Sequence, residues 1–190
     1  MKSNFAGKTL LLIAAGLAAG TTGAFGQTYA ATATSALSVT VSPEAGINIA
    51  APTSLTEATG AGIFGSPYTG TTNFTYKVRT TKTGGAGTVT VKITTDFVGT
   101  GGPSVATPPT AGDALTYSCT AAASGTPCSG SANTASTSSA TGVITFGADA
   151  HSAGGGSASD AGSVTWSLTN DPVYKTGSYT ATATFTISAT

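Results

Sequence analysis

The chain carries very little charge. Asp, Glu, Lys and Arg together make up 7% of its 190 residues, and seven basic residues balance seven acidic ones. Soluble domains usually contain about a quarter charged residues. No cluster of Lys and Arg forms the basic surface that nucleic-acid binding requires, so nucleic acid is excluded as an expected partner. Solubility must rest instead on the hydroxyl groups of the many Thr and Ser residues.

Residues suited to catalysis or metal binding are also few. His151 is the one histidine, and no G-x-S-x-G motif accompanies it. The seven carboxylates lie at least ten residues apart, whereas calcium loops and glycosidases bring several together. The pair that loops could most readily bring together is Asp149 with Asp160. We therefore predict no enzymatic activity, no catalytic residue, no cofactor and no metal site.

Long apolar runs are missing. No run reaches the roughly 20 residues that a membrane-spanning helix needs. The longest, residues 9–19 (TLLLIAAGLAA), follows two lysines and precedes a small-x-small cleavage pattern, as in a secretory signal peptide. We therefore predict a signal peptide over residues 1–26 and a mature domain over residues 27–190, secreted or at the cell surface, without a membrane span. Cleavage after Ala33 and an uncleaved anchor are the alternatives.

Cysteine is limited to Cys119 and Cys128. An even number of cysteines in an exported chain predicts a disulfide, and Gly125 and Pro127 between them favour a hairpin-like loop. Redox-active pairs are usually closer in sequence, and two thiols with one distant histidine cannot supply the four ligands of zinc. We expect an intramolecular bond that stabilises the fold by about 2.5 kcal/mol through loop entropy.

What the chain does contain is alternation of apolar residues with Thr or Ser, the period of a β-strand with one buried face. Turn residues separate these runs, and no helical period appears outside the signal peptide. About eight strands at this spacing predict an all-β protein with one antiparallel sandwich. The expected strands cover residues 29–42, 47–49, 71–80, 88–96, 115–119, 142–147, 163–170 and 178–189.

The inward faces of these strands predict the core. Two strands around a glycine-rich turn, residues 71–80 and 88–96, form the clearest hairpin pattern in the chain. In the loop over residues 50–70, Ile63, Phe64 and Tyr68 are candidates to plug the core. The residues that we expect to be buried are Phe74, Tyr76, Val89, Val91, Ile93, Val164, Trp166, Leu168, Phe185 and Ile187.

The alternation at the start of the mature chain, residues 27–42, is longer than one strand needs. Small residues such as Ala31 and Ala33 precede the larger Leu37. The simpler interpretation is an ordinary first strand with a terminal tail. The alternative is that residues 27–35 form an extended arm that adds to the open sheet edge of another subunit.

The closing stretch, residues 177–187 (GSYTATATFTI), resembles the last strand of spore coat protein U-type domains and related secreted pilin-like subunits. Residues 37–41 (LSVTV) are similar to their first strand. The resemblance implies an immunoglobulin-like sandwich that acts in a surface fibre through strand exchange, without enzymatic activity. The leading hypothesis is therefore an exported structural or surface-assembly subunit.

A second hypothesis belongs to another class of protein: a secreted adhesin or carbohydrate-binding module that uses the loops over residues 50–70, 99–112 and 148–161. Tyr174, which follows a proline in a loop, is the aromatic residue best placed to be exposed. Trp166 alternates with Val164 and Leu168, so the core is its expected place.

Overall fold

The computed structural model describes residues 31–58, 62–155 and 159–190. The predicted signal peptide, residues 1–26, lies outside the described residues, as do residues 27–30 of the predicted arm. The chain divides into an N-terminal unit, residues 1–39, and a body, residues 40–190. Within the N-terminal unit, residues 32–39 carry no secondary structure, and residues 31–39 are exposed to solvent.

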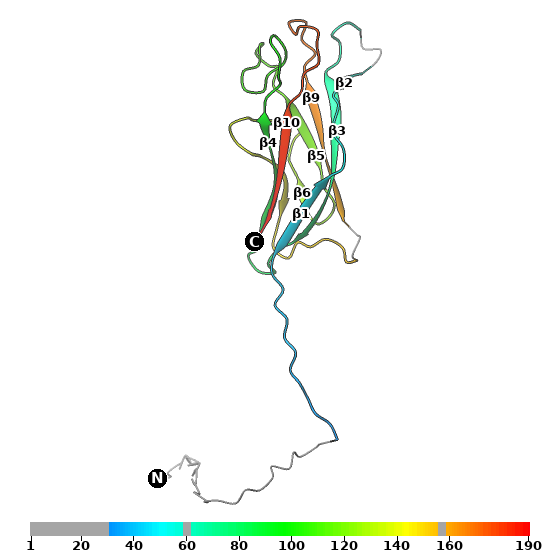
Figure 1. Cartoon of the computed structure of the whole chain (residues 1–190), viewed down its shortest axis with the longest axis vertical. Helices are drawn as coiled ribbons and strands as arrows, with labels where there is room; N and C mark the ends of the chain where they lie inside the picture. Colours follow the sequence, from blue (N-terminus) through cyan, green and yellow to red (C-terminus); the bar gives the residue numbers. More distant parts are fainter. Residues whose placement is uncertain (1–30, 59–61, 156–158) are drawn as a thin grey trace, which may run out of the picture. The chain divides into compact units, whose positions relative to one another are not determined.

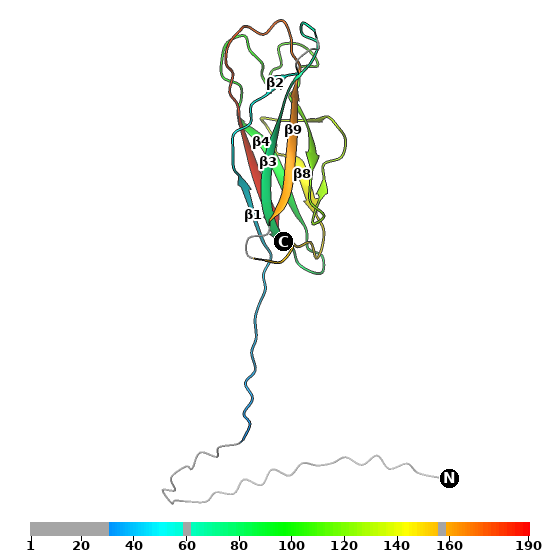
Figure 2. The ribbon, with the colours of Figure 1, turned by 90° about the vertical axis from the view of Figure 1, so that its right-hand side faces the viewer.

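The body consists of two antiparallel β-sheets packed face to face (Figures 1 and 2). The first sheet has the order β1-β3-β9-β5-β7, with β2 added to β3, and the second has the order β10-β4-β8-β6. The strands of the first sheet are β1 (Glu44–Ile49), β2 (Thr56–Glu57), β3 (Tyr68–Arg79), β5 (Thr116–Thr120), β7 (Asn133–Thr134) and β9 (Asp160–Leu168). Those of the second are β4 (Gly87–Thr95), β6 (Thr126–Pro127), β8 (Thr141–Phe146) and β10 (Thr182–Ala189).

This arrangement confirms the predicted all-β sandwich. The described residues contain no helix, so none of them forms a helix that could cross a membrane. Alternation places Thr and Ser outside and the large side chains between the sheets, where they remove apolar surface from water. The buried core comprises Phe74, Tyr76, Val78, Val89, Val91, Ile93, Leu115, Tyr117, Ala135, Val143, Ile144, Phe146, Val164, Trp166 and Leu168.

The predicted hairpin between residues 71–80 and 88–96 is wrong. Both strands form, but β3 pairs with β1, β2 and β9, whereas β4 pairs with β8 and β10. The turn between them therefore crosses from one sheet to the other. The reason is that each strand has one strongly apolar face. When the two strands face each other across the core, both apolar faces are buried.

Several predicted boundaries and burials also need correction. Ile63 is 90% exposed and Phe64 is 53% exposed, so neither plugs the core; Tyr68 does pack against it. Phe185 and Ile187 are only partly buried, because β10 is an edge strand. The last strand begins at Thr182 rather than Ser178, since the intervening residues belong to a loop.

The loop before β10 is held by Tyr179. Its hydroxyl donates to the Lys175 carbonyl at 2.8 Å, and its ring lies against Gly99 and Gly102, where any Cβ would collide with the ring. Residues 177–179 therefore belong to this loop, and the strand begins only at Thr182.

The expected first strand, residues 29–42, is wrong for residues 31–42, which form no strand, and residues 29–30 lie outside the described residues. The first strand of the body is β1, which begins directly after Pro43. Proline has no N–H to donate to a ladder, so Pro43 marks the start of β1 rather than the end of an earlier strand.

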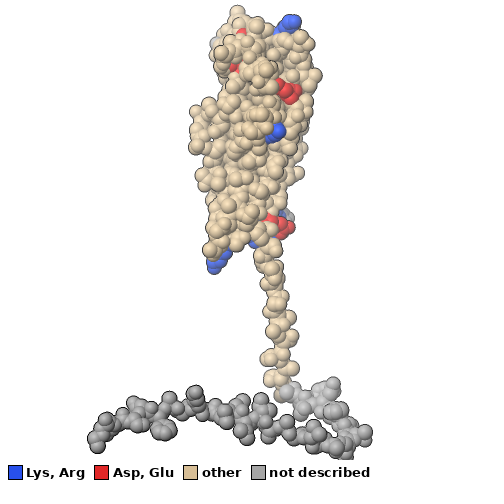
Figure 3. Space-filling view, turned by 90° about the vertical axis from the view of Figure 1, so that its left-hand side faces the viewer, with Lys and Arg blue, Asp and Glu red and all other residues tan. Residues whose placement is uncertain are grey.

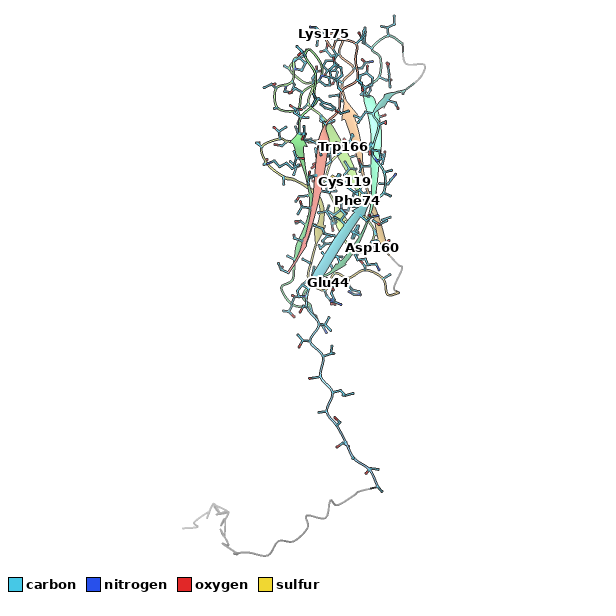
Figure 4. The ribbon with its side chains drawn as sticks, viewed as in Figure 1. Glu44, Phe74, Cys119, Asp160, Trp166 and Lys175 are labelled. Atoms are coloured by element: carbon cyan, nitrogen blue, oxygen red, sulfur yellow. A yellow bond between two sulfur atoms is a disulfide. The ribbon has the colours of Figure 1, made fainter. Side chains whose placement is uncertain are left out.

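The two ends of the body are used below under fixed names. The tip comprises the loops over residues 62–67, 96–115 and 169–181. The base comprises the turn over residues 80–86 and the loop over residues 147–155. Strand β10 runs from the tip to the base, since Thr182 pairs with Thr95 and Ala189 pairs with Gly87. Figure 4 shows Lys175 at the tip and Glu44 at the base.

Candidate functional site: the open seam between β1 and β10

On one side of the sandwich, each sheet ends in a strand whose outer edge has no partner among the described residues. Strand β1 is the edge of the first sheet and β10 is the edge of the second, and the two contact each other without a ladder between them (Figure 1). Within the described residues, neither strand has a partner on its outer edge. A free edge presents a row of N–H and C=O groups that can pair with another strand. We call this the seam.

The seam is apolar and incompletely covered. Ala45 and Ile47 of β1 and Phe185 and Ile187 of β10 are only partly buried, although they pack against the core. Ile49 is 38% exposed. The Val89 side chain of the neighbouring strand β4, by contrast, is fully buried. The seam is therefore a place where the core is incompletely covered.

Phe185 links the seam to the centre of the core. Its ring centroid lies 5.6 Å from that of Phe74 and 6.5 Å from that of Trp166. Despite these aromatic contacts, Phe185 is only partly buried. A strand added along β10 would cover more of its surface.

The segment over residues 31–41 has the complementary pattern. Its odd positions carry Leu37, Val39 and Val41, which are 95%, 85% and 62% exposed. Its even positions carry mainly Thr and Ser. An extended chain with this alternation has one apolar face, which water disfavours and an apolar groove favours.

The junction between this segment and β1 is tightly defined. Arg79 donates from Nε to the Ser42 carbonyl at 2.9 Å and from Nη2 to Glu44 at 3.2 Å. The two-residue turns that most often join paired strands need a positive φ at one or both central positions, which Pro43 cannot adopt. A tight hairpin that would return residues 31–41 onto their own β1 is therefore disfavoured.

The opposite side of the sandwich is closed. A disulfide joins Cys119 of β5 to Cys128, just after β6, with 5.5 Å between their Cα atoms. The Cys128 N–H donates to the Val143 carbonyl at 2.8 Å. The predicted disulfide is present, but the loop is not a hairpin, because β5 and β6 belong to different sheets. The bond therefore links the two sheets.

Replacement of Cys119 by Ser is expected to lower the free energy of unfolding by about 2–3 kcal/mol without abolishing the fold, because the closed loop is short. Urea unfolding of the purified variant measures the change. Reduced wild-type protein serves as the matched control and should show the same loss. Two free thiols in protein recovered from its native compartment would contradict the bond.

The residues considered for chemistry make the following contacts in the structure. The His151 ring donates from Nδ1 to the Asp149 carbonyl at 2.7 Å, which is a local turn contact. The Asp160 carboxylate accepts from Ser124, which also contacts the hydroxyl of buried Tyr76 at 3.1 Å. No group of three or more His, Cys, Asp or Glu side chains in the described ranges could hold a metal ion. These residues serve turns and packing.

The carboxylate with the most donors is Asp96, which sequence reasoning missed. It accepts backbone N–H groups from Phe97, Val105 and Ala106 and the hydroxyl of Ser104, at 2.7–3.1 Å. Burial alone would raise the pKa of Asp96, but these four hydrogen bonds outweigh burial and lower it. Asp96 thus holds the tip loop in one shape. The sequence feature that could have indicated this role is an Asp at the start of a Gly/Pro-rich loop, where Asp commonly bonds the nearby backbone.

The aromatic residues weighed for sugar binding, Tyr68, Tyr117, Trp166, Tyr174 and Tyr179, are buried or partly buried. Trp166 is 4% exposed, as its strand pattern predicts. Tyr174, the expected exposed aromatic, is half-buried and donates to Asp113 at 3.0 Å. Burial, this hydrogen bond and the nearby charges raise the pKa of Tyr174. A surface hollow of about 490 Å³ beside Cys128 is lined mostly by Thr, Ser and Asn.

The charged residues do not mark a second candidate functional site on the face shown in Figure 3. The face in Figure 3 shows a few scattered Lys, Arg, Asp and Glu side chains on an otherwise uncharged surface. The Arg79–Glu44 ion pair is exposed, so it adds little to the free energy of unfolding. Its effect is to position the start of β1. Comparison of the chain with protein-family models, with curated proteins and with solved structures gave no match. The seam and the segment over residues 31–41 are thus the features that carry a functional argument.

Proposed function

We propose that this protein is an exported structural subunit that assembles by strand addition, without catalytic activity. Residues 31–41 of one copy add as a strand along the seam of the next copy. The observation that carries this proposal is a match: the seam lacks one covering strand, and the same chain holds an exposed strand-like segment with one apolar face.

The match extends to the type of interaction. The free edges of β1 and β10 offer backbone groups for a ladder, which would supply affinity. The partly covered Phe185 and Ile187 offer an apolar floor, on which Leu37 and Val39 would lie. Alternation of side chains would then set the register, because a slip by one residue turns the apolar face to water.

In this proposal the segment adds to the seam of another molecule. Pro43 and the Arg79 contact to Ser42 disfavour a tight return onto the same body. One subunit therefore provides both a donor segment and an acceptor seam, which is a heterologous contact that propagates into a filament.

The test is a pair of matched variants of the mature protein. Val39→Asp places a carboxylate on the apolar face and should weaken self-association by roughly 100-fold, because a charge would be buried without a partner. Ser38→Asp, on the opposite face, carries the same charge and should assemble nearly as wild type does. Size-exclusion chromatography and negative-stain microscopy give the readout.

Equal loss of assembly in both variants would show that charge, not the apolar face, matters, and would contradict the proposal. Wild-type protein that stays monomeric at high concentration and in its native compartment would do the same. If that monomer is retained on a glycan or matrix surface, the protein is instead a binding module.

A further inference from the structure

The large hydrophobic side chains that are exposed in the described ranges form two sets. One set belongs to the segment and the seam: Leu37, Val39, Val41 and Ile49. The other set consists of Ile63, Phe64, Val98 and Val173, which are 90%, 53%, 62% and 54% exposed. All four members of the second set lie in tip loops, and none of the large exposed hydrophobics in the described ranges lies at the base. Exposed apolar side chains gathered at one end indicate a contact surface.

The tip loops that carry this second set are braced. The Val98 N–H donates to the Thr180 carbonyl at 3.0 Å, which ties two loops together. The Val173 N–H donates to the Asp171 carboxylate at 2.8 Å. Phe64 has a positive φ of 54°, an unfavourable conformation for a residue with a Cβ. Loops held in this way present their side chains with little further ordering on binding.

The short connection between segment and body brings two copies into contact. Only Ser42 and Pro43 separate Val41 from Glu44, the first residue of β1, so the body of a donor must begin within about 10 Å of the seam end that Val41 reaches, given three steps of about 3.3 Å per extended residue. Since β1 begins at the base, the donor presents its base to that end.

The direction of the added strand decides which end of the acceptor is met. If the segment ran parallel to β10, Val41 would lie at the acceptor's base, where the acceptor's own Ser42 and Pro43 leave the body. That space is needed for the acceptor's own segment to reach another copy. A filament therefore requires the antiparallel direction, with Val41 at the acceptor's tip.

We infer that the tip loops of each copy pack against the base of the next copy, so that Ile63, Phe64, Val98 and Val173 are buried in the filament. This inference rests on the proposed strand addition. The base offers small exposed residues, Ala148, Ala153 and Gly154, against which larger apolar side chains can pack. The tip-to-base contact adds to the strand contact and makes the joint between copies stiff.

The test uses single cysteines in the full mature chain, whose own two cysteines are paired. Val98→Cys marks the tip, Lys82→Cys marks the base, and Thr145→Cys, on the exposed face of β8, is the control. Equal mixtures of two variants are assembled, oxidised mildly and separated by non-reducing electrophoresis. The tip and base mixture should cross-link roughly 100-fold more than mixtures with the control, as expected for tethered groups at millimolar effective concentration.

The outcomes separate this inference from the function on which it rests. Cross-linking of Lys82→Cys with itself would show base-to-base contact and overturn the inference. Val39-dependent oligomers without tip-to-base cross-links would also overturn it and would leave strand addition intact. Absence of oligomers in every variant and in wild type would refute strand addition and the inference together.

Discussion

Replacement of Trp166 by Ala is expected to lower the free energy of unfolding by about 3–5 kcal/mol, the usual range for removal of a large buried aromatic side chain. The indole is 4% exposed and lies at the centre of the sandwich. Its ring centroid is 5.5 Å from that of Tyr117 and 6.5 Å from that of Phe185. The substitution would leave a cavity in the core between the two sheets.

The indole also has a polar role. Its Nε1 donates to the Thr72 hydroxyl at 2.8 Å, and that hydroxyl contacts the Thr53 hydroxyl at 2.6 Å. Thr72 is itself buried, so loss of the indole removes one of its partners and adds to the cost.

Urea unfolding followed by circular dichroism measures the effect. Thr165→Ala, the exposed neighbour on the same strand, is the matched control and should change stability by less than about 0.5 kcal/mol. A loss below about 1 kcal/mol for Trp166→Ala would contradict the packing and would point to a surface role.

Deletion of residues 27–41 is expected to abolish self-assembly while the body remains folded. The buried core residues all lie between Phe74 and Leu168, so the deletion removes none of them. The seam persists, but no copy can supply the strand that covers it. The expected product is a monomer at concentrations where the full mature chain forms filaments.

A synthetic peptide of residues 27–42 provides the decisive complement. It should bind the deleted protein and raise its melting temperature, because a ligand that binds only the folded state stabilises it by mass action. A peptide with Leu37, Val39 and Val41 replaced by Ser is the control and should not bind. Assembly of the deleted protein equal to that of the full chain would refute strand addition.

Local pattern was enough to predict most of the longer strands of the body and their faces. Alternation is a property of each strand by itself: at β4 and β9 it identified the buried residues Val89, Val91, Ile93, Val164, Trp166 and Leu168, all confirmed. The scarcity of charge and the pairing of Cys119 with Cys128 were also readable from the sequence, because each depends on composition or count.

What only the tertiary structure decided was which strand lies beside which. Alternation shows which face of a strand is buried but not which strand lies beside it. The sequence therefore predicted a hairpin of β3 and β4, whereas the two strands lie in opposite sheets. The same limit hid the seam: Phe185 has the pattern of a core residue, and its partial exposure follows from the position of β10 at an edge. Burial depends on neighbours brought together over long sequence separations, and that information is not local to any strand.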